Sequence, residues 1–256
     1  MCASASAERP GVTQPRIGTA GWTIPRPYAD SFPADGSHLQ RYARRFNAVE
    51  INSSFYRPHR RATYERWAAS VPADFLFAAK IPRQVTHELR LVGTEAALDA
   101  FLTQVIGLGD RLGPLLVQLA PSLAFDAQTV ARFFTALRSR FVGSIVCEPR
   151  HASWFTPRAE EILTEHRVAR VAADPAVVPK AAEPGGWTGL RYLRLHGAPR
   201  MYYSDYATDQ IAVHAARLKR AAADGHAWCI FDNTALGAAA DNALALSGMF
   251  KDARHA

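Results

Sequence analysis

Ser144-Ile-Val-Cys-Glu148 is a short β-branched run, typical of a buried strand. A stretch with helical spacing of apolar residues follows over 158–166, and a second strand-like run follows over 168–172. A strand, a helix and another strand in this order form a parallel pair joined by a right-handed crossover. This unit therefore predicts an α/β protein built on parallel strands.

The same alternation extends over nearly the whole chain of 256 residues. Strand-like runs occupy 16–21, 48–52, 75–80, 115–119, 144–148, 168–172, 190–195 and 227–231. Helical stretches occupy 37–46, 63–69, 94–108, a segment opened by Asp126, 158–166, 209–224 and 235–246. Eight strands, most followed by a helix, predict a single (β/α)₈ barrel of the TIM type. A doubly wound open sheet is the alternative, but no Gly-x-Gly-x-x-Gly turn follows a strand to favour it.

The domain organisation follows from where this alternation starts and stops. Residues 1–15 are Ala/Ser-rich and lack the basic head and apolar core of a secretory signal, so we expect a disordered leader. We expect one domain over 16–250 and a tail over 251–256. No helical period is visible over 175–189, so the sixth βα unit is expected to lack a regular helix.

Composition bounds the class of protein. Charged residues make up 21% of the chain, and its apolar runs are too short for a transmembrane helix. The three cysteines, Cys2, Cys147 and Cys229, are not paired in sequence; the last two lie in strand-like runs and are expected to be buried thiols. These features favour a cytoplasmic protein and leave its oligomeric state open. The net charge of +7 favours an anionic partner, although no block of like charge resembles a nucleic-acid tail.

Polar residues gather where the expected strands end. They are Glu50, Asn52, Lys80, Gln118, Glu148, Arg150, His151, Asp174, Arg194, His196, Asp232 and Asn233. In a barrel the carboxyl ends of all strands open into one mouth, where active sites are found. Polar groups in such strands are costly to bury unless they are paired. The pattern predicts a functional site at the mouth; a hydrogen-bonded structural plug is the alternative.

Four of these residues are candidates for catalysis. Glu50 and Glu148 suit a general acid–base pair, although each could instead pair with a neighbouring cation. Lys80 is either a Schiff-base amine or, as we favour, a cation bound to a carboxylate or an anionic ligand. His196 suits an acid–base group, an anion ligand, a metal ligand or a buried structural histidine.

A wider set is expected to bind substrate: Trp22, Asn52, Tyr56, Gln118, Arg150, His151, Trp154, Asp174, Arg194, Tyr203, Asp232 and Asn233. The aromatic members lie on loops after strands and suit stacking on a sugar or a base. The alternative is that they roof the barrel core. Asp232 precedes the last helical stretch and could also be only a helix cap.

The residues also leave a divalent metal open, and no other cofactor is indicated. Glu50, Glu148, Asp174 and His196 are ligand types that Mg²⁺, Mn²⁺ or Zn²⁺ accepts. No His-Glu-x-x-His pattern or closely spaced cysteine pair strengthens the prediction.

Seven segments resemble one known family, in order and spacing, from about residue 16 to 246. They are Gly18-Thr-Ala-Gly-Trp22, Val49-Glu-Ile-Asn-Ser-Ser-Phe-Tyr56, Phe77-Ala-Ala-Lys80 with Thr86-His87, Leu116-Val-Gln-Leu-Ala-Pro121, Glu148-Pro-Arg-His-Ala-Ser-Trp-Phe155, Tyr192-Leu-Arg-Leu-His-Gly197 and Phe231-Asp-Asn-Thr234 with Ala240-Asp-Asn-Ala243. This set is similar to the YecE-like family, domain of unknown function 72. The resemblance implies a TIM-type barrel and supplies no reaction. Asp232 stands where many relatives have asparagine, and Ala120 where relatives often have proline.

Three functional hypotheses follow. The first is an enzyme with hydrolase-type acid–base chemistry on a polar, anionic small molecule, such as a phosphoester or glycoside. The second is a nucleic-acid-binding protein, which predicts a continuous basic stripe and strongly salt-dependent binding. The third is a small-molecule sensor that uses the same pocket without turnover.

Overall fold

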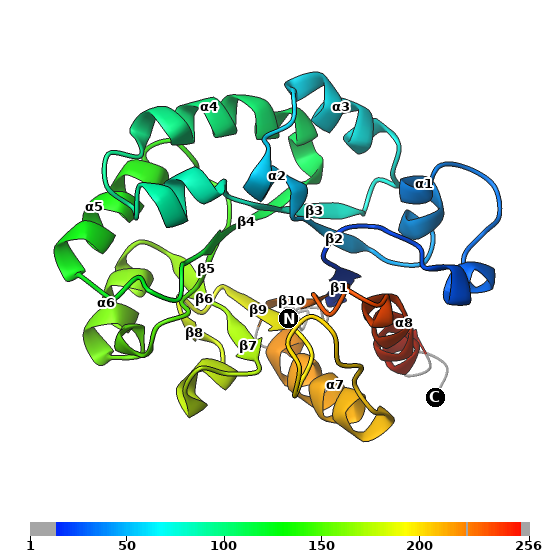
Figure 1. The fold of residues 1–256 in the computed structure, drawn as a ribbon. Helices are drawn as coiled ribbons and strands as arrows, with labels where there is room; N and C mark the ends of the chain where they lie inside the picture. The colour runs from blue at the N-terminus through cyan, green and yellow to red at the C-terminus, as the bar shows by residue number, and fades with distance from the viewer. Residues whose placement is uncertain (1–13, 224, 252–256) are drawn as a thin grey trace, which may run out of the picture.

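The structure is a computed structural model that describes residues 14–223 and 225–251 (Figure 1). The leader expected over 1–15 and the tail expected over 251–256 therefore lie almost wholly outside the described residues, as does Cys2. Within the described chain, no helix is long and apolar enough to cross a membrane. Cys147 and Cys229 are buried free thiols, as expected.

The strands form two sheets. One has the order β1 (Arg16–Thr19), β10 (His226–Phe231), β9 (Leu190–Leu195) and β7 (Ala172–Asp174). The other has the order β2 (Ala48–Ile51), β3 (Leu76–Lys80), β4 (Leu112–Gln118), β5 (Ile145–Glu148), β6 (Val168–Arg170) and β8 (Gly185–Gly186). All pairs are parallel except β6 with the short β8. The parallel α/β prediction and its eight strand positions are confirmed.

The two sheets adjoin at both of their junctions. At the first, Ala20 and Glu50 form an isolated parallel bridge. Here β1 and β2 approach so closely that a Cβ on Gly18 would lie 2.0 Å from the Ala48 carbonyl oxygen. At the second, the continuous stretch 168–174 pairs with β5 at its start and with β9 at its end. The result is a TIM-barrel-like arrangement of two parallel sheets.

Helices lie around the outside of the strands (Figure 1). They are α1 (His38–Ala43), α2 (Ser53–Tyr56), α3 (Arg61–Ala69), α4 (Glu95–Val105), α5 (Ala127–Arg138), α6 (Pro157–Glu165), α7 (Thr208–Ala223) and α8 (Ala238–Lys251). Asp126 caps α5, since its side chain accepts a hydrogen bond from Thr129 N at 2.8 Å. Between β7 and β9 the chain forms a 3-10 turn over Pro179–Ala182 and the short β8 but no α-helix, which confirms the expectation for the sixth unit.

Strand alternation separates two apolar cores. The larger lies between strands and helices, and the smaller packs on the opposite face of the strands. The inner core consists of Ala48, Ala78, Leu116, Val146, Ala169, Val171, Leu190, Tyr192, Trp228 and Ile230. Two positions further along six of these strands come Glu50, Lys80, Gln118, Glu148, Arg194 and Asp232. The pleat therefore brings these six polar side chains to the same side of their strands, as a layer above the inner core.

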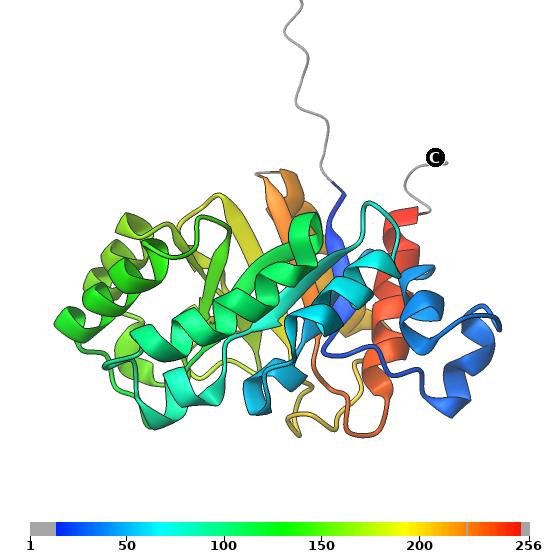
Figure 2. The same cartoon turned by 90° about the horizontal axis from the view of Figure 1, so that it is seen from above.

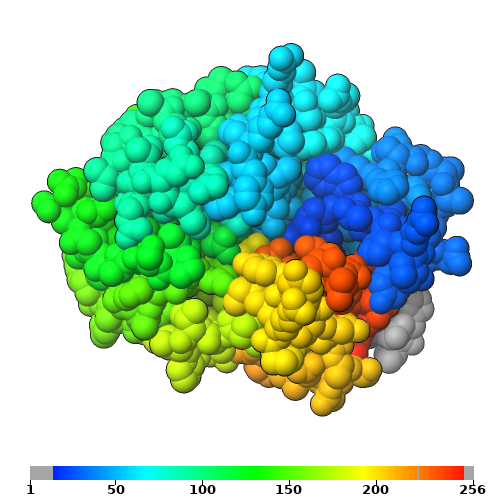
Figure 3. Space-filling model, viewed as in Figure 1, coloured from blue at the N-terminus to red at the C-terminus, as the bar shows by residue number. Residues whose placement is uncertain are grey.

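This layer lies toward the carboxyl ends of the strands. Figure 2 shows the loops after β9 and β10 on the side of the molecule opposite the start of β1. The two loops touch, since Ala235 N donates to the Tyr202 carbonyl oxygen at 3.1 Å. In the space-filling view, which has the orientation of Figure 1, these yellow and orange-red segments lie next to each other (Figure 3).

Candidate functional site

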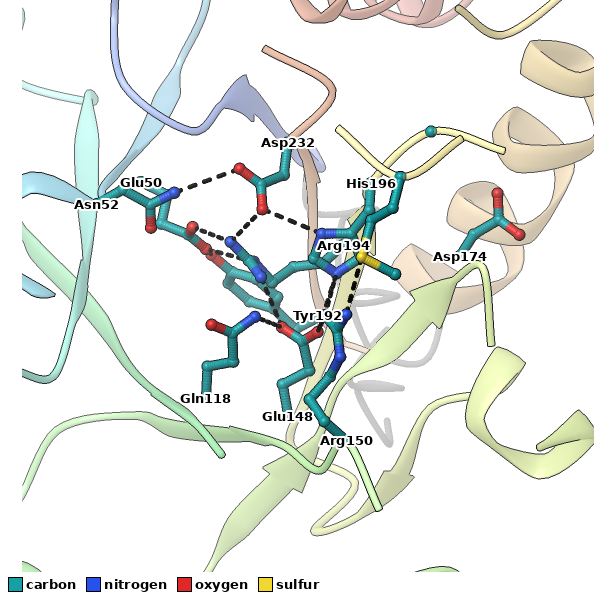
Figure 4. A network of polar contacts seen from close by, with 12 residues as sticks. Glu50, Asn52, Gln118, Glu148, Arg150, Asp174, Tyr192, Arg194, His196 and Asp232 are labelled. Atoms are coloured by element: carbon teal, nitrogen blue, oxygen red, sulfur yellow. Dashed lines mark hydrogen bonds and ion pairs between the residues drawn. The ribbon is translucent and has the colours of Figure 1, made fainter. Parts of the chain in front are cut away.

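Arg194, near the end of β9, is the centre of the polar layer (Figure 4). Its Nε donates to Glu50 Oε2 at 3.0 Å and its Nη2 to Glu50 Oε1 at 2.7 Å, a bidentate pair. Nη1 donates to Glu148 Oε2 at 2.6 Å, and Nη2 also donates to Asp232 Oδ2 at 3.0 Å. Arg194, Glu50 and Glu148 are all fully buried. One guanidinium therefore holds carboxylates from three different strands.

His196 bridges two of the same carboxylates. Its Nε2 lies 2.9 Å from Glu148 Oε1 and its Nδ1 lies 3.0 Å from Asp232 Oδ2. Both ring nitrogens must donate to satisfy two carboxylates, which requires the imidazolium form. Burial alone would lower the pKa of His196, but Glu148 and Asp232 outweigh it and raise this pKa above its usual value.

The carboxylates respond in the opposite direction. Burial alone would raise the pKa of Glu148, but Arg194, His196 and Arg150 hold it well below its usual range. Burial would also raise the pKa of Asp232, but Arg194 and His196 lower it. Both groups are therefore ionised at neutral pH and serve as acceptors.

Amide and guanidinium groups complete the cluster. Arg150 Nη1 donates to Glu148 Oε1 at 2.8 Å, and Gln118 Nε2 lies 3.4 Å from Glu148 Oε2. Asn52 Nδ2 donates to Asp232 Oδ1 at 3.3 Å, while Asn52 Oδ1 is buried without a hydrogen-bond partner. Asp232 is thus an ion-pair partner in this cluster, and the alternative that it only caps the last helix is wrong: α8 begins later, at Ala238.

Lys80 differs from every other charged member of the layer. Its side chain is at the end of β3 and is only 7% exposed. Its Nζ forms no hydrogen bond or ion pair with any described residue, and it lies 4.0 Å from the centroid of the Phe55 ring. Burial, aided by the nearby Arg194 charge, lowers the pKa of Lys80 to about 8. Of the two bound states expected for Lys80, pairing with a carboxylate of this chain does not occur among the described residues, where Arg194 and His196 bind the three carboxylates. Binding of an anionic ligand by Lys80 stays a prediction.

The charges of the cluster can be balanced group by group. Glu50, Glu148 and Asp232 are matched by the Arg194 and Arg150 guanidiniums and the His196 imidazolium. These six groups neutralise one another. Lys80 is left as the surplus positive charge in a dry environment, where an isolated charge is costly.

The loop after β9 covers the His196 side of the cluster. Arg150 Nη2 donates to Met201 Sδ at 2.9 Å, and a thioether is a weak acceptor. The Tyr202 ring meets His196 edge-on, with 5.7 Å between the ring centroids. Tyr202 is 39% exposed and has a positive φ of 70°, an uncommon conformation for a tyrosine.

Four predicted binding residues lie outside this network. Asp174 accepts from Tyr206 Oη at 2.7 Å and points away from the cluster (Figure 4). Asn233 Nδ2 donates to the Ser204 carbonyl oxygen. The other two organise local structure: His151 Nδ1 accepts from the backbone of Ser153, and the fully buried Trp154 indole donates to the Leu123 carbonyl oxygen at 2.8 Å.

The three remaining aromatic candidates lie apart from Arg194. Trp22 packs edge-on against Trp67, with 4.9 Å between centroids. Tyr56 is 74% exposed beside Phe55, and Tyr203 lies under the Arg200 guanidinium. Their binding roles stay predictions.

Three residues near the cluster were missed in the sequence. Tyr192 Oη donates to Glu50 Oε2 at 2.9 Å, but an aromatic residue in a strand reads as core. Phe55 and His87 pack edge-on, with 5.0 Å between the ring centroids, and Lys80 Nζ lies over the same Phe55 ring. Both stand in the family-like segments quoted above, and Thr86-His87 was the available signal.

No group of three or more His, Cys, Asp or Glu side chains is arranged to hold a metal ion anywhere in 14–223 or 225–251. The reason is visible in the cluster, where Arg194 lies between the carboxylates and occupies their lone pairs. A cavity of about 420 Å³ does open beside the strand ends, near Gly21 and Leu236. None of the clustered residues lines it.

These features define a class: an α/β protein of TIM-barrel-like architecture with a buried ionic cluster at the carboxyl ends of its strands. The chain belongs to the DUF72 family, described as a protein of unknown function, whose model matches residues 16–256. The resemblance noted in the sequence is thereby confirmed.

Known proteins show the same relationship. The UPF0759 protein YecE of Escherichia coli K12 is 30% identical over 152 residues, covering 57% of this chain and 55% of the relative. The UPF0759 protein YunF of Bacillus subtilis 168 is 28% identical over 149 residues, covering 55% and 52%. The chain thus spans about half the length of the curated relatives it matches.

Solved structures share the fold. A DUF72 family protein from Enterococcus faecalis V583 superposes with a TM-score of 0.78 at 22% identity, covering 93% of this chain and 96% of that one. A DUF72 family protein from Thermotoga maritima MSB8 gives 0.77 at 24% identity, covering 92% and 98%. The 3-keto-D-glucoside 4-epimerase YcjR of E. coli gives 0.53 at 12% identity, covering 93% and 100%. At these identities the likeness concerns the fold alone.

Proposed function

We propose that this chain binds a small organic anion at the carboxyl ends of its strands and is an enzyme that acts on that anion. The observation that carries the proposal is the surplus charge of Lys80. Three carboxylates and three other cations neutralise one another, and Lys80 alone lacks a partner among the described residues. A ligand carboxylate or phosphate would supply the missing negative charge.

A second donor supports the same ligand type. Arg150 Nη2 faces the Met201 thioether, which accepts hydrogen bonds weakly. An anionic oxygen is a much stronger acceptor, and its bond to a guanidinium is charge-assisted. An anion that replaced Met201 as the acceptor would therefore form a stronger hydrogen bond with Arg150 Nη2.

The hydrolase hypothesis needs a different division of roles. Acid–base catalysis by Glu50 and Glu148 requires both carboxylates to face a substrate bond, but the Arg194 guanidinium lies between them. In our proposal these two residues position Arg194 and His196, while Lys80 contacts the ligand. Whether the reaction is hydrolysis of a phosphoester or glycoside stays a prediction, as do the nucleic-acid and sensor alternatives.

A second part of the proposal concerns barrel closure, the domain bounds and the cellular location. We infer that the two sheets form one closed (β/α)₈ barrel, that residues 16–250 are one domain and that the protein works in the cytoplasm. The adjoining junctions at Ala20–Glu50 and at 168–174 support closure.

Thermal unfolding with acetate or inorganic phosphate tests the binding proposal, with chloride holding the ionic strength constant. A ligand at about 100 times its Kd stabilises the native state by about 2.7 kcal/mol. We expect the parent and Lys219→Met, a change at an exposed lysine, to respond equally, and Lys80→Met not to respond. An equal response of Lys80→Met, or none from the parent, would contradict the proposal. Binding of DNA that weakens steeply with salt and ignores Lys80 would favour the nucleic-acid alternative.

A further inference from the structure

The Lys80 amine has the surroundings of a reactive group rather than of a structural cation. It is 7% exposed, so almost all of its side chain is removed from water. An aromatic face at 4.0 Å is its nearest recorded contact, and no described acceptor holds its protons in place. Lys80 is the last residue of β3, two positions beyond Ala78 of the inner core.

We propose that Lys80 forms a covalent imine with a small carbonyl compound that also carries one anionic group, such as a 2-oxo acid. This inference rests on the anion-binding function proposed above and names its substrate class. Anions without an aldehyde or ketone group, such as simple carboxylates, would bind but not react.

The step balances without any co-reactant. The Lys80 ammonium first releases one proton to solvent. The neutral Nζ attacks the carbonyl carbon, a C–N bond forms, one proton moves from this nitrogen to the carbonyl oxygen, and that oxygen then takes back the proton that was released. The resulting carbinolamine then loses that oxygen as water, which leaves a protonated C=N bond. Overall, an ammonium and a carbonyl compound give an iminium and one water, so charge is conserved.

Conservation of charge in this step indicates that the substrate carries an anionic group. The surplus positive charge of Lys80 passes unchanged to the iminium, which still lacks a partner in the cluster. A carboxylate or phosphate on the same molecule would neutralise it. A neutral aldehyde would leave the iminium as uncompensated as the ammonium was, so only an anionic substrate gains this neutralisation.

Charged groups from several elements act on Lys80. Arg194 from β9 disfavours its protonated form, whereas Glu50, Asp232 and Glu148 favour it, and burial decides the direction. His87 is a further titratable neighbour, packed edge-on against the same Phe55 ring. Burial and the charge of Lys80 lower the pKa of His87, so its imidazole is neutral at pH 7 and available for proton transfer.

Reductive trapping tests the inference on the full chain. The protein is mixed with glyoxylate, an anionic aldehyde, at about pH 7.5, borohydride is added, and peptide mass spectrometry locates the adduct. The chain has only four lysines, Lys80, Lys180, Lys219 and Lys251, so the assignment is simple. A pKa of about 8 leaves roughly 200-fold more neutral amine on Lys80 than on an ordinary lysine at this pH.

Among the four lysines, the expected result is a borohydride-dependent adduct on Lys80 alone; the α-amino group, whose ordinary pKa is about 8, is scored separately. The Lys80 adduct should form much faster with glyoxylate than with glycolaldehyde, a neutral aldehyde of similar size, and should be blocked by acetate. Labelling spread evenly over the four lysines, or no adduct on Lys80, would overturn the inference. In that case acetate-dependent stabilisation of the parent, absent in Lys80→Met, would leave the binding function standing. Trapping on Lys80 without any preference for the anionic aldehyde would instead refute the anion site.

Discussion

Replacement of Lys80 by methionine should stabilise the folded protein at neutral pH. Methionine has a similar length, adapts to irregular space and carries no charge to desolvate. The amine is buried against Phe55 without a partner among the described residues, so its protonated form is unfavourable in the native state. Most buried charged groups have a partner, and removal of such a group destabilises the protein. Stabilisation on removal is therefore specific to a buried charge without a partner.

The magnitude follows from the pKa of Lys80. Its value of about 8 lies roughly 2.5 units below the usual 10.5, and each unit corresponds to about 1.4 kcal/mol. Lys80→Met should therefore gain up to about 3 kcal/mol at pH 7, which raises the Tm by about 6–12 °C for a domain of this size. The unfolded chain holds the Lys80 proton between pH 8 and 10.5 while the folded chain has released it, so parental stability rises with pH in this window. The advantage of the variant should shrink accordingly by pH 10.

Urea unfolding of the parent, Lys80→Met and Lys219→Met at pH 7 and pH 10 measures both effects. Lys219 is exposed on α7, so its replacement should change stability by less than about 0.5 kcal/mol at either pH. Destabilisation of Lys80→Met by more than about 1 kcal/mol at pH 7 would mean that the ammonium has a partner in the native state, contrary to the charge balance proposed here.

Two further predictions concern the paired groups of the cluster. Arg194→Met leaves three carboxylates buried without their guanidinium, so we expect a loss of about 3–5 kcal/mol in urea unfolding, against less than about 1 kcal/mol for Arg140→Met at an exposed pair. Equal losses in the two variants would argue against the central role of Arg194. The lowered pKa values of Glu148 and Asp232 contribute stability that is present above their unfolded values near 4 and is lost as the pH falls through the folded values. Acid unfolding monitored by circular dichroism should therefore be less steep for Glu148→Gln than for the parent, and identical curves would contradict this reasoning.

The strand positions were predictable because the local spacing of apolar residues distinguishes strands from helices. The common location of Glu50, Lys80 and Glu148 was predictable too, since parallel strands bring their carboxyl ends to one face. Local patterns also sufficed for the missing helix of the sixth unit, where proline and glycine interrupt any helical period.

The partners within the cluster were not predictable. Which carboxylate meets Arg194 depends on the stagger between strands, and the three carboxylates that Arg194 binds at once lie 38, 46 and 144 residues from it along the chain. Because Arg194 binds all three carboxylates, Lys80 has no partner among the described residues. A rule that pairs each buried base with a nearby acid would have given Lys80 a carboxylate partner. Asp174 resembles the other strand-end acids in sequence, yet Tyr206 takes up its carboxylate away from the cluster.

Direct titration of the Lys80 amine tests the central claim most closely. Protein labelled with ¹³C at the lysine ε position gives one signal per lysine, and Lys80→Arg identifies the signal of interest. We expect an apparent pKa near 8 for this amine, which acetate shifts upward, while acetate leaves the titration of the other lysine signals unchanged. A Lys80 signal that titrates with the other lysines and ignores acetate would show that its charge is already paired, and the proposed site would have no basis.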